Sequence, residues 1–210
     1  MGDENDEAWA ICRIETEHLL LRRWAPADAP ALLGVMDASE AHLAAWGPWL
    51  SERPRTVEDQ AQLLERFRSN FDLGKEFVFG VFSHAGECLG SVGLHRRVGP
   101  RALELGYWLA RHQCGQGWGR EMVAAACQAA FAAPWLERLE IHCAPDNLPS
   151  ARIAARLGFR HDVTLADRLL SARGLHDAMI WSLWRAAPKL ALAETRASGF
   201  DADGERVFPP

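Results

Sequence analysis

The chain has 210 residues, with 23 Lys and Arg against 28 Asp and Glu, and so a formal net charge of −5 at pH 7. Hydrophobic residues make up 49% and charged residues 24%, which is typical of a globular domain with a substantial core and excludes disordered and fibrous classes. The mild acidity, without a basic tail, argues against nucleic acid as a ligand.

Membrane insertion and secretion are not expected. The longest apolar stretch, residues 122–133, is interrupted by Gln128 and is shorter than the roughly 20 residues of a membrane-spanning helix. The N-terminus is acidic where a secretory signal is basic and then apolar. Five cysteines without CxxC spacing fit neither a disulfide framework nor a zinc ribbon. We therefore expect a soluble cytoplasmic protein with reduced cysteines.

The first part of the chain predicts a strand followed by two helices. Residues 16–24 contain three consecutive leucines and predict the strand, and Pro26 begins a helical stretch toward Met36. Thr56 with an acid three residues later resembles a capping box and predicts a second helix that ends near Asn70.

Alternating apolar residues then predict an antiparallel meander of three strands, at 77–82, 88–95 and 103–110. A glycine-rich loop, a helix at about 120–132 and a strand at 139–143 follow and form a β-loop-α-β unit, in which the two flanking strands should be parallel.

The rest of the domain should contain a short helix and two strands. Asn147 begins the helix and Gly158 ends it, and strands at about 163–169 and 178–184 close the sheet as an antiparallel pair. From Ala186 onward the periodicity is lost. We divide the chain into an acidic N-terminal tail at 1–13, a domain at 14–186 and a C-terminal tail at 187–210.

Three alternate glycines, Gly115, Gly117 and Gly119, stand between a strand and a helix. Such a loop can turn backbone N–H groups toward one centre, where the helix N-terminus favours a phosphate. No Lys-Ser/Thr follows, so a Walker loop is excluded, and the place of the loop after a meander is a poor fit to a Rossmann fingerprint. The alternative is a turn that binds no ligand.

Several weak motifs in one order resemble the GCN5-related N-acetyltransferase (GNAT) superfamily and, within it, the RimJ/RimL-type ribosomal-protein N-terminal acetyltransferases. The resemblance covers about residues 14–186. It includes Leu20-Leu-Arg22, Trp46-Gly-Pro-Trp49, Gly93-Leu-His95, Glu104-Leu-Gly-Tyr-Trp108, Gly115-Gln-Gly117-Trp-Gly119, Asp146-Asn147, Leu157-Gly-Phe159 and Trp181-Ser-Leu183.

The resemblance implies an α/β (α+β) fold, with a mixed, mostly antiparallel, V-splayed sheet flanked by helices. It implies acetyl-CoA as co-substrate, held by the β-loop-α-β unit. The implied coenzyme-binding residues are Trp108, Leu109, Ala110, Cys114, Gly115, Gln116, Gly117, Trp118, Gly119, Arg120 and Asn147. The family usually has Gln or Arg where this chain has Cys114, so we expect the loop to bind the coenzyme phosphates more weakly.

Amine acetylation needs a group that takes a proton from the amine and one that returns a proton to the thiolate. By family analogy Glu104 is the candidate base, directly or through water, and the alternative is an ordinary solvated strand glutamate. The resemblance suggests Ser150 as the acid, although a serine there could also satisfy a helix end. The tyrosine that is the acid in many members has no obvious counterpart, since Tyr107, the only tyrosine, precedes the phosphate loop.

Acceptor-side residues are less defined. Trp46 and Trp49 line an acceptor pocket or cap the core, and His95 belongs to the same region. We expect no metal site, because the eight histidines show no HxxxH or HxH pair, and we expect buried apolar roles for Cys114 and Cys143.

The sequence therefore predicts an acetyl-CoA-dependent N-acetyltransferase that acts on a primary amine, such as the N-terminus of a protein, by direct attack in a ternary complex. The alternatives are a small-molecule amine acetyltransferase for polyamines, amino acids or aminoglycosides, an enzyme with a longer acyl group, and a non-catalytic acyl-CoA-binding module. The protein is expected to be a monomer or homodimer.

Overall fold

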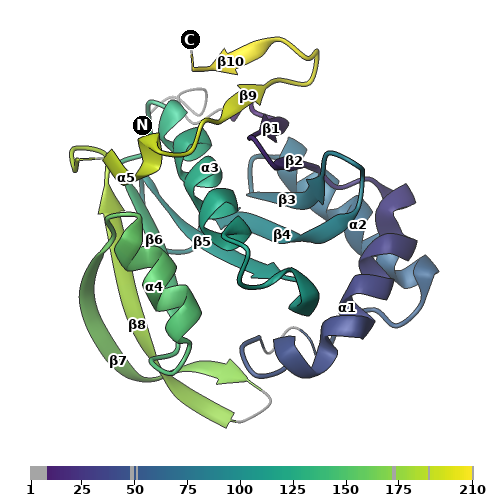
Figure 1. Cartoon of the computed structure of the whole chain (residues 1–210), viewed down its shortest axis with the longest axis horizontal. Coiled ribbons are helices and arrows are strands. Elements are labelled where there is room, and N and C mark those ends of the chain that lie inside the picture. The colour runs from purple at the N-terminus through teal and green to yellow at the C-terminus, as the bar shows by residue number, and fades with distance from the viewer. Residues whose placement is uncertain (1–8, 48–49, 51, 172–173, 189, 210) are drawn as a thin grey trace.

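The computed structural model describes residues 9–47, 50, 52–171, 174–188 and 190–209. A mixed sheet of ten strands runs through these residues in the order β10-β9-β1-β2-β3-β4-β5-β6-β8-β7 (Figure 1). Neighbouring strands are antiparallel apart from the parallel pair β5 and β6. The predicted fold class, a mostly antiparallel mixed sheet flanked by helices, is confirmed.

The strands are β1 (Arg13–Glu15), β2 (Leu19–Arg23), β3 (Glu76–Ser83), β4 (Cys88–His95), β5 (Ala102–Leu109), β6 (Arg138–Cys143), β7 (Arg160–Ser171), β8 (Gly174–Trp184), β9 (Ser198–Phe200) and β10 (Arg206–Phe208). The α-helices are α1 (Ala29–Leu43), α2 (Val57–Asp72), α3 (Trp118–Ala132), α4 (Leu148–Arg156) and α5 (Leu190–Ala193), and two 3-10 helices are η1 (Pro26–Asp28) and η3 (Arg111–Gln113).

Helices cover both faces of the sheet (Figure 1). Helices α3 and α4 pack on one face, which we call the α3/α4 face, and α1 and α2 pack on the other, the α1/α2 face. Alternate residues of a strand point to opposite faces, so on β5 Leu105 joins the core under α3 while Trp108 packs with the α1 and α2 cluster. The faces therefore carry different groups to the same stretch of β5.

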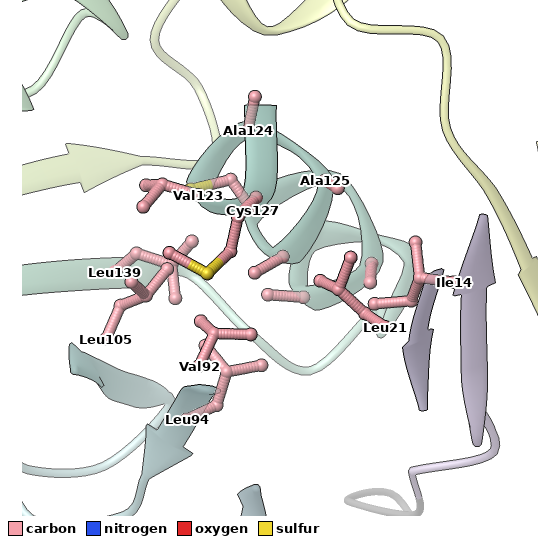
Figure 2. Packing of buried hydrophobic residues seen from close by; sticks show 14 of the residues in the cluster. Ile14, Leu21, Val92, Leu94, Leu105, Val123, Ala124, Ala125, Cys127 and Leu139 are labelled. Atoms are coloured by element: carbon pink, nitrogen blue, oxygen red, sulfur yellow. The ribbon is translucent and has the colours of Figure 1, made fainter. Parts of the chain in front are cut away.

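Helix α3 lies close to the sheet because its buried side is made of small residues. Figure 2 shows Val123 and Cys127 directed toward Leu105 and Leu139 of the parallel strands. All four side chains are fully buried. Because small side chains let a helix approach a sheet closely at normal packing density, this core fixes the start of α3 against β5 and β6.

The parallel pair separates before its strands end. The ladder between β5 and β6 joins residues 102–104 to residues 138–140 and stops at Glu104 and Glu140. Beyond it β5 stays paired with β4 as far as Leu109, and β6 stays paired with β8 as far as Cys143. We call this separation the β5–β6 fork, and it gives the V-shaped opening that the fold class predicts.

The two ends of the chain differ from the expectation of tails. Trp9 stacks on Phe77 with ring centroids 4.5 Å apart, and Ile11 is buried. β9 and β10 extend the sheet beside β1. A strand of three residues is too short to show an alternation of apolar and polar residues. The sequence therefore did not predict β9 and β10. The division of the chain at residues 13 and 186 stays a prediction.

Most other predicted elements are present with shifted ends. The strand predicted at 16–24 is β2, at Leu19–Arg23, and β1 before it was not predicted. The helix expected toward Met36 is a 3-10 turn followed by α1, which runs to Leu43. β7 is longer than predicted at both ends, at Arg160–Ser171. The parallel pairing of the β-loop-α-β unit and the antiparallel closing pair are confirmed.

Candidate active site

The glycine-rich loop leads from β5 through η3 into α3. Gly115 and Gly117 have φ angles of +86° and +90°, a left-handed conformation that glycine adopts without strain. Gly117 is also the N-cap of α3, and Gly119 lies in its first turn against Ile153 of α4. The first amides of the helix therefore face the loop, where they and the helix dipole favour an anion.

Cys114 lies at the start of this loop and contacts a histidine that the sequence did not connect with it. Its Sγ is 3.6 Å from Nε2 of His42 and 3.5 Å from the carbonyl oxygen of Ala110. Burial and the charge of Arg111 lower the pKa of His42. These two contacts hold the side chain of Cys114 against α1 and the residue that follows β5.

Other predicted loop residues have protein partners. The side chain of Gln116 donates to Oε1 of Gln113 over 2.9 Å. Arg120 forms an ion pair with Glu194, in the turn after α5, and Trp118 packs against the core. The loop is therefore fixed by side chains, which leaves its backbone amides as the groups directed at a ligand.

Ser150 and Tyr107 meet on the α3/α4 face beside the β5–β6 fork. Ser150 is buried in the first turn of α4, and its Oγ is 2.9 Å from the hydroxyl of Tyr107 on β5. The N-cap of α4 is Asn147, whose Oδ1 accepts from the backbone N–H of Ser150 over 3.4 Å. The hydroxyl of Ser150 is thus not used as a helix cap and is held by the tyrosine instead.

Burial keeps the neighbouring groups protonated. It raises the pKa of Tyr107 far above its ordinary value and also raises the pKa of Cys143, which lies beside Ser150 at the end of β6. The phenol is therefore a permanent hydroxyl, and the thiol behaves as the buried apolar residue that the sequence suggested. Sequence reasoning missed the link between Tyr107 and Ser150, because 43 residues separate them.

Glu104 lies on the α1/α2 face at the last rung of the β5–β6 ladder. Nε and Nη2 of Arg97 donate to its two carboxylate oxygens over 2.8 and 2.5 Å. Burial alone raises the pKa of Glu104, but the hydrogen bonds and charge of Arg97 outweigh it and lower the pKa below its ordinary value. Glu104 is therefore a fixed negative charge and not a solvated strand residue, with 13% of its side chain exposed.

Two residues of β6 extend this charged group, and the sequence did not indicate them for proton transfer. Nε2 of His142 is 2.7 Å from Oε2 of Glu140, and its Nδ1 is 3.6 Å from Oε2 of Glu104. The only signal in the sequence is the alternation of Arg138, Glu140 and His142 along one face of a strand.

His95, predicted on the acceptor side, is the β4 residue paired with Glu104. Its Nδ1 is 3.0 Å from Oε2 of Glu76, and the other carboxylate oxygen of Glu76, Oε1, accepts from Nδ2 of Asn70 over 2.6 Å. The hydrogen bond from His95, and that from Asn70, outweigh burial and lower the pKa of Glu76. Carboxylates and histidines thus follow one another across four strands of the α1/α2 face, β3, β4, β5 and β6.

The predicted aromatic residues are only partly placed. Trp46 lies in the turn after α1, where its backbone N–H donates to the carbonyl of Leu43 over 2.9 Å, and it is partly exposed. Trp49 lies outside the described residues. Trp108 packs against the α1 and α2 cluster from β5. An acceptor-lining role for Trp46 and Trp49 stays a prediction.

Stability should depend on the ionisation of Glu104. A carboxylate whose pKa is lower in the folded than in the unfolded state adds stability above its unfolded pKa and loses it as the pH falls through the folded pKa. The free energy of unfolding should therefore fall as the pH drops below 4.5, the reference value for glutamate, and fall less in Glu104→Gln. Urea unfolding at several pH values measures this. An equal fall in both proteins would contradict it.

Neither a metal centre nor a membrane span emerges from the described part of the chain. It holds no group of three or more His, Cys, Asp or Glu side chains arranged to bind a metal ion. None of its helices combines the length and apolarity needed to cross a bilayer.

Comparisons with known proteins agree with this geometry. The profile of the acetyltransferase (GNAT) domain family matches residues 18–160, more than half of the chain. The protein named "Putative ribosomal N-acetyltransferase YdaF" from Bacillus subtilis (strain 168) is 26% identical over 179 residues, which cover 82% of this chain and 93% of that protein.

Two solved structures are also similar. The ribosomal-protein-S5-alanine acetyltransferase from Vibrio fischeri has a TM-score of 0.75 and 25% identity, covering 84% of this chain and 99% of that one. Mycobacterium smegmatis RimJ, in complex with CoA-disulfide, has a TM-score of 0.77 and 23% identity, covering 88% and 91%.

The fold and the family match define the class of this protein as an acetyl-CoA-dependent N-acetyltransferase. The chain belongs to the acetyltransferase (GNAT) domain family. The resemblance to its RimJ/RimL type is confirmed.

Proposed function

We propose that this enzyme transfers the acetyl group of acetyl-CoA to a primary amine, namely the N-terminal amine of a protein. The amine attacks acetyl-CoA directly in a ternary complex. The observation that carries the proposal is the β5–β6 fork. It has the Ser150 and Tyr107 hydroxyls on one face and the Glu104 carboxylate on the other. An acid and a negative charge are thus available on opposite sides of one opening.

The coenzyme would lie with its pyrophosphate on the amides of the 114–120 loop and its pantetheine arm along Trp108, Leu109 and Ala110. Support comes from the end of the ladder at Glu104, because it leaves this stretch of β5 without β6 beside it. An extended amide-bearing chain can pair with such a strand edge. Asn147, at the N-terminus of α4, would contact the arm near the thioester.

In the reaction the amine nitrogen attacks the thioester carbonyl carbon, a C–N bond forms and the C–S bond breaks. The amine loses a proton on the α1/α2 face, and the departing sulfur takes a proton from Ser150, which recovers one from solvent. Backbone N–H groups near Trp108 and Leu109 would stabilise the carbonyl oxygen as it becomes negative, a contribution of roughly 3 kcal/mol per good donor.

A protonated amine is the acceptor that the charges favour. Glu76, Glu104 and Glu140 lie on the α1/α2 face of a chain with a net charge of −5. The curated relative is named for ribosomal N-acetylation and the Vibrio fischeri structure for acetylation of a ribosomal protein, which supports a protein N-terminus over a small-molecule amine. Such an acceptor accords with the cytoplasmic location expected from the sequence.

Thiol release from acetyl-CoA tests the function against peptides with free N-termini, polyamines and aminoglycosides. We expect turnover with peptides and loss of turnover when the same peptide is N-terminally blocked. Turnover only with polyamines or aminoglycosides would contradict the protein acceptor. Tight coenzyme binding without turnover on any amine would favour a non-catalytic binding module.

A further inference from the structure

The proposed reaction needs a group that takes a proton from an ammonium ion, and Glu104 is poorly suited to do so directly. Both of its carboxylate oxygens are occupied by Arg97, at 2.8 and 2.5 Å. A base works best when its pKa is near the working pH, whereas Arg97 keeps the pKa of Glu104 below the ordinary range of a carboxyl group. A different group should receive the proton.

His142 lies beside Glu104 and has the required geometry. Because the Glu140 carboxylate can only accept, the 2.7 Å contact with Nε2 places the ring proton on that nitrogen. Nδ1 then carries the lone pair. Its 3.6 Å separation from Glu104 is longer than a hydrogen bond, so this lone pair is free to receive a proton. The side chain is 20% exposed, which leaves it accessible from the α1/α2 face.

We propose that His142 is the catalytic base of this enzyme, an inference that rests on the proposed amine acetyltransferase function. Nδ1 of His142 takes the proton of the acceptor amine. Glu140 fixes the tautomer and the ring orientation, as a carboxylate does for the histidine of a hydrolase triad. Glu104 becomes a positioning residue, whose negative charge lies 3.6 Å from the imidazolium that forms.

The surroundings of His142 contain charges of both signs. β5 contributes Glu104, with Arg97 bound to it, and β6 contributes Glu140, whose Oε1 is 2.8 Å from Nε of Arg138. On β4, His95 is paired with Glu104 and hydrogen bonds to Glu76 of β3. The β8 residue paired with His142 is the apolar Ile180. The charged groups nearest to the ring are the carboxylates of Glu104 and Glu140.

The proton balance closes without a further reactant. The ammonium of the acceptor gives one proton to Nδ1 of His142, the neutral amine forms the C–N bond, and the thiolate takes a proton on the Ser150 side. His142 then releases its proton to solvent, and Ser150 recovers one from solvent. The base and the acid lie on opposite faces of the sheet, so neither competes for the other's proton.

The test is the dependence of kcat/KM on pH, measured by thiol release with two peptides whose N-terminal amines differ in pKa. The acid limb of this profile is the range in which kcat/KM falls as the pH is lowered. If its midpoint differs between the two peptides, it reports the ionisation of the peptide amine. If its midpoint is the same for both, it reports a group of the enzyme. We expect His142→Gln to lower kcat/KM at least ~100-fold and to remove the enzyme's acid limb. Added imidazole should restore part of the activity of His142→Ala.

Two further variants separate catalysis from folding. His161→Gln makes the same change at an exposed histidine of β7 and should leave the profile unchanged. Glu140→Gln should lower kcat/KM, because an amide at residue 140 can donate to Nε2 of His142 and so allow the tautomer that carries its proton on Nδ1. Coenzyme affinity should be unchanged in all variants, as measured by calorimetry.

An acid limb retained in His142→Gln, or a loss of kcat/KM of less than ~3-fold, would overturn this proposal. Water beside Glu104 would then be the group that takes the proton from the amine. Failure of the wild-type enzyme to acetylate any amine would overturn the proposed function itself, and this inference with it. The two failures are distinct, because the second is seen before any variant is made.

Discussion

Replacement of Ser150 by alanine is expected to lower kcat about 100-fold and leave coenzyme affinity within about threefold of the wild type. The hydroxyl of Ser150 lies beside the β5–β6 fork on the α3/α4 face, 2.9 Å from the hydroxyl of the protonated Tyr107. The substitution leaves the backbone N–H of residue 150 bonded to Asn147, so α4 keeps its N-cap. Steady-state kinetics and calorimetry with CoA measure the two effects.

Tyr107→Phe is the informative companion to this variant. Its ring stays packed, but Ser150 loses the hydroxyl that orients it, so kcat should fall by about tenfold or less. The double variant should be no slower than Ser150→Ala alone, because both changes act through one proton. If Tyr107→Phe were slower than Ser150→Ala, the tyrosine and not the serine would deliver the proton.

Gly90→Ala is expected to destabilise the protein by about 2–3 kcal/mol and to lower coenzyme affinity at least ~10-fold. Gly90 of β4 pairs with Leu109 of β5, and a Cβ atom there would lie 2.2 Å from the carbonyl oxygen of Trp108. The obstacle is backbone, which cannot rotate away as a side chain can. The end of β5 must therefore move, and this is the stretch along which the pantetheine arm is proposed to lie.

Gly34→Ala is the matched control for that variant. Gly34 is exposed in α1, and a Cβ atom there meets nothing within 4 Å. The same substitution should stabilise the helix by roughly 0.5–1 kcal/mol. Urea unfolding of both variants, with CoA titrations, measures the contrast. Unchanged coenzyme affinity in Gly90→Ala would show that the end of β5 does not position the coenzyme.

Local patterns were enough to predict the centre of the fold. The alternation of apolar residues from 77 to 110 gave the three strands β3, β4 and β5, because a strand with a buried face must repeat every two residues. The glycines at 115, 117 and 119 marked the turn into α3, and Gly117 has the left-handed conformation that such a turn requires. These features depend on neighbours in the chain.

The short strands at the two ends could not be predicted in this way. β1, β9 and β10 have three residues each, and each is stabilised by pairing with a strand already in the sheet. Burial of Ile11 and Phe208 against the main core holds them there. Such segments have no period of their own, so their structure depends on the rest of the molecule.

The sequence by itself determined the family resemblance, the phosphate-type loop and the candidate residues Glu104 and Ser150, since each belongs to a motif of adjacent residues. Tertiary structure alone decided their partners: Arg97 on Glu104, Tyr107 on Ser150, and Glu140 on His142. The ionisation of a side chain depends on the burial and charges around it. Those charges come from other strands and helices, so only the folded sheet sets which group can hold a proton.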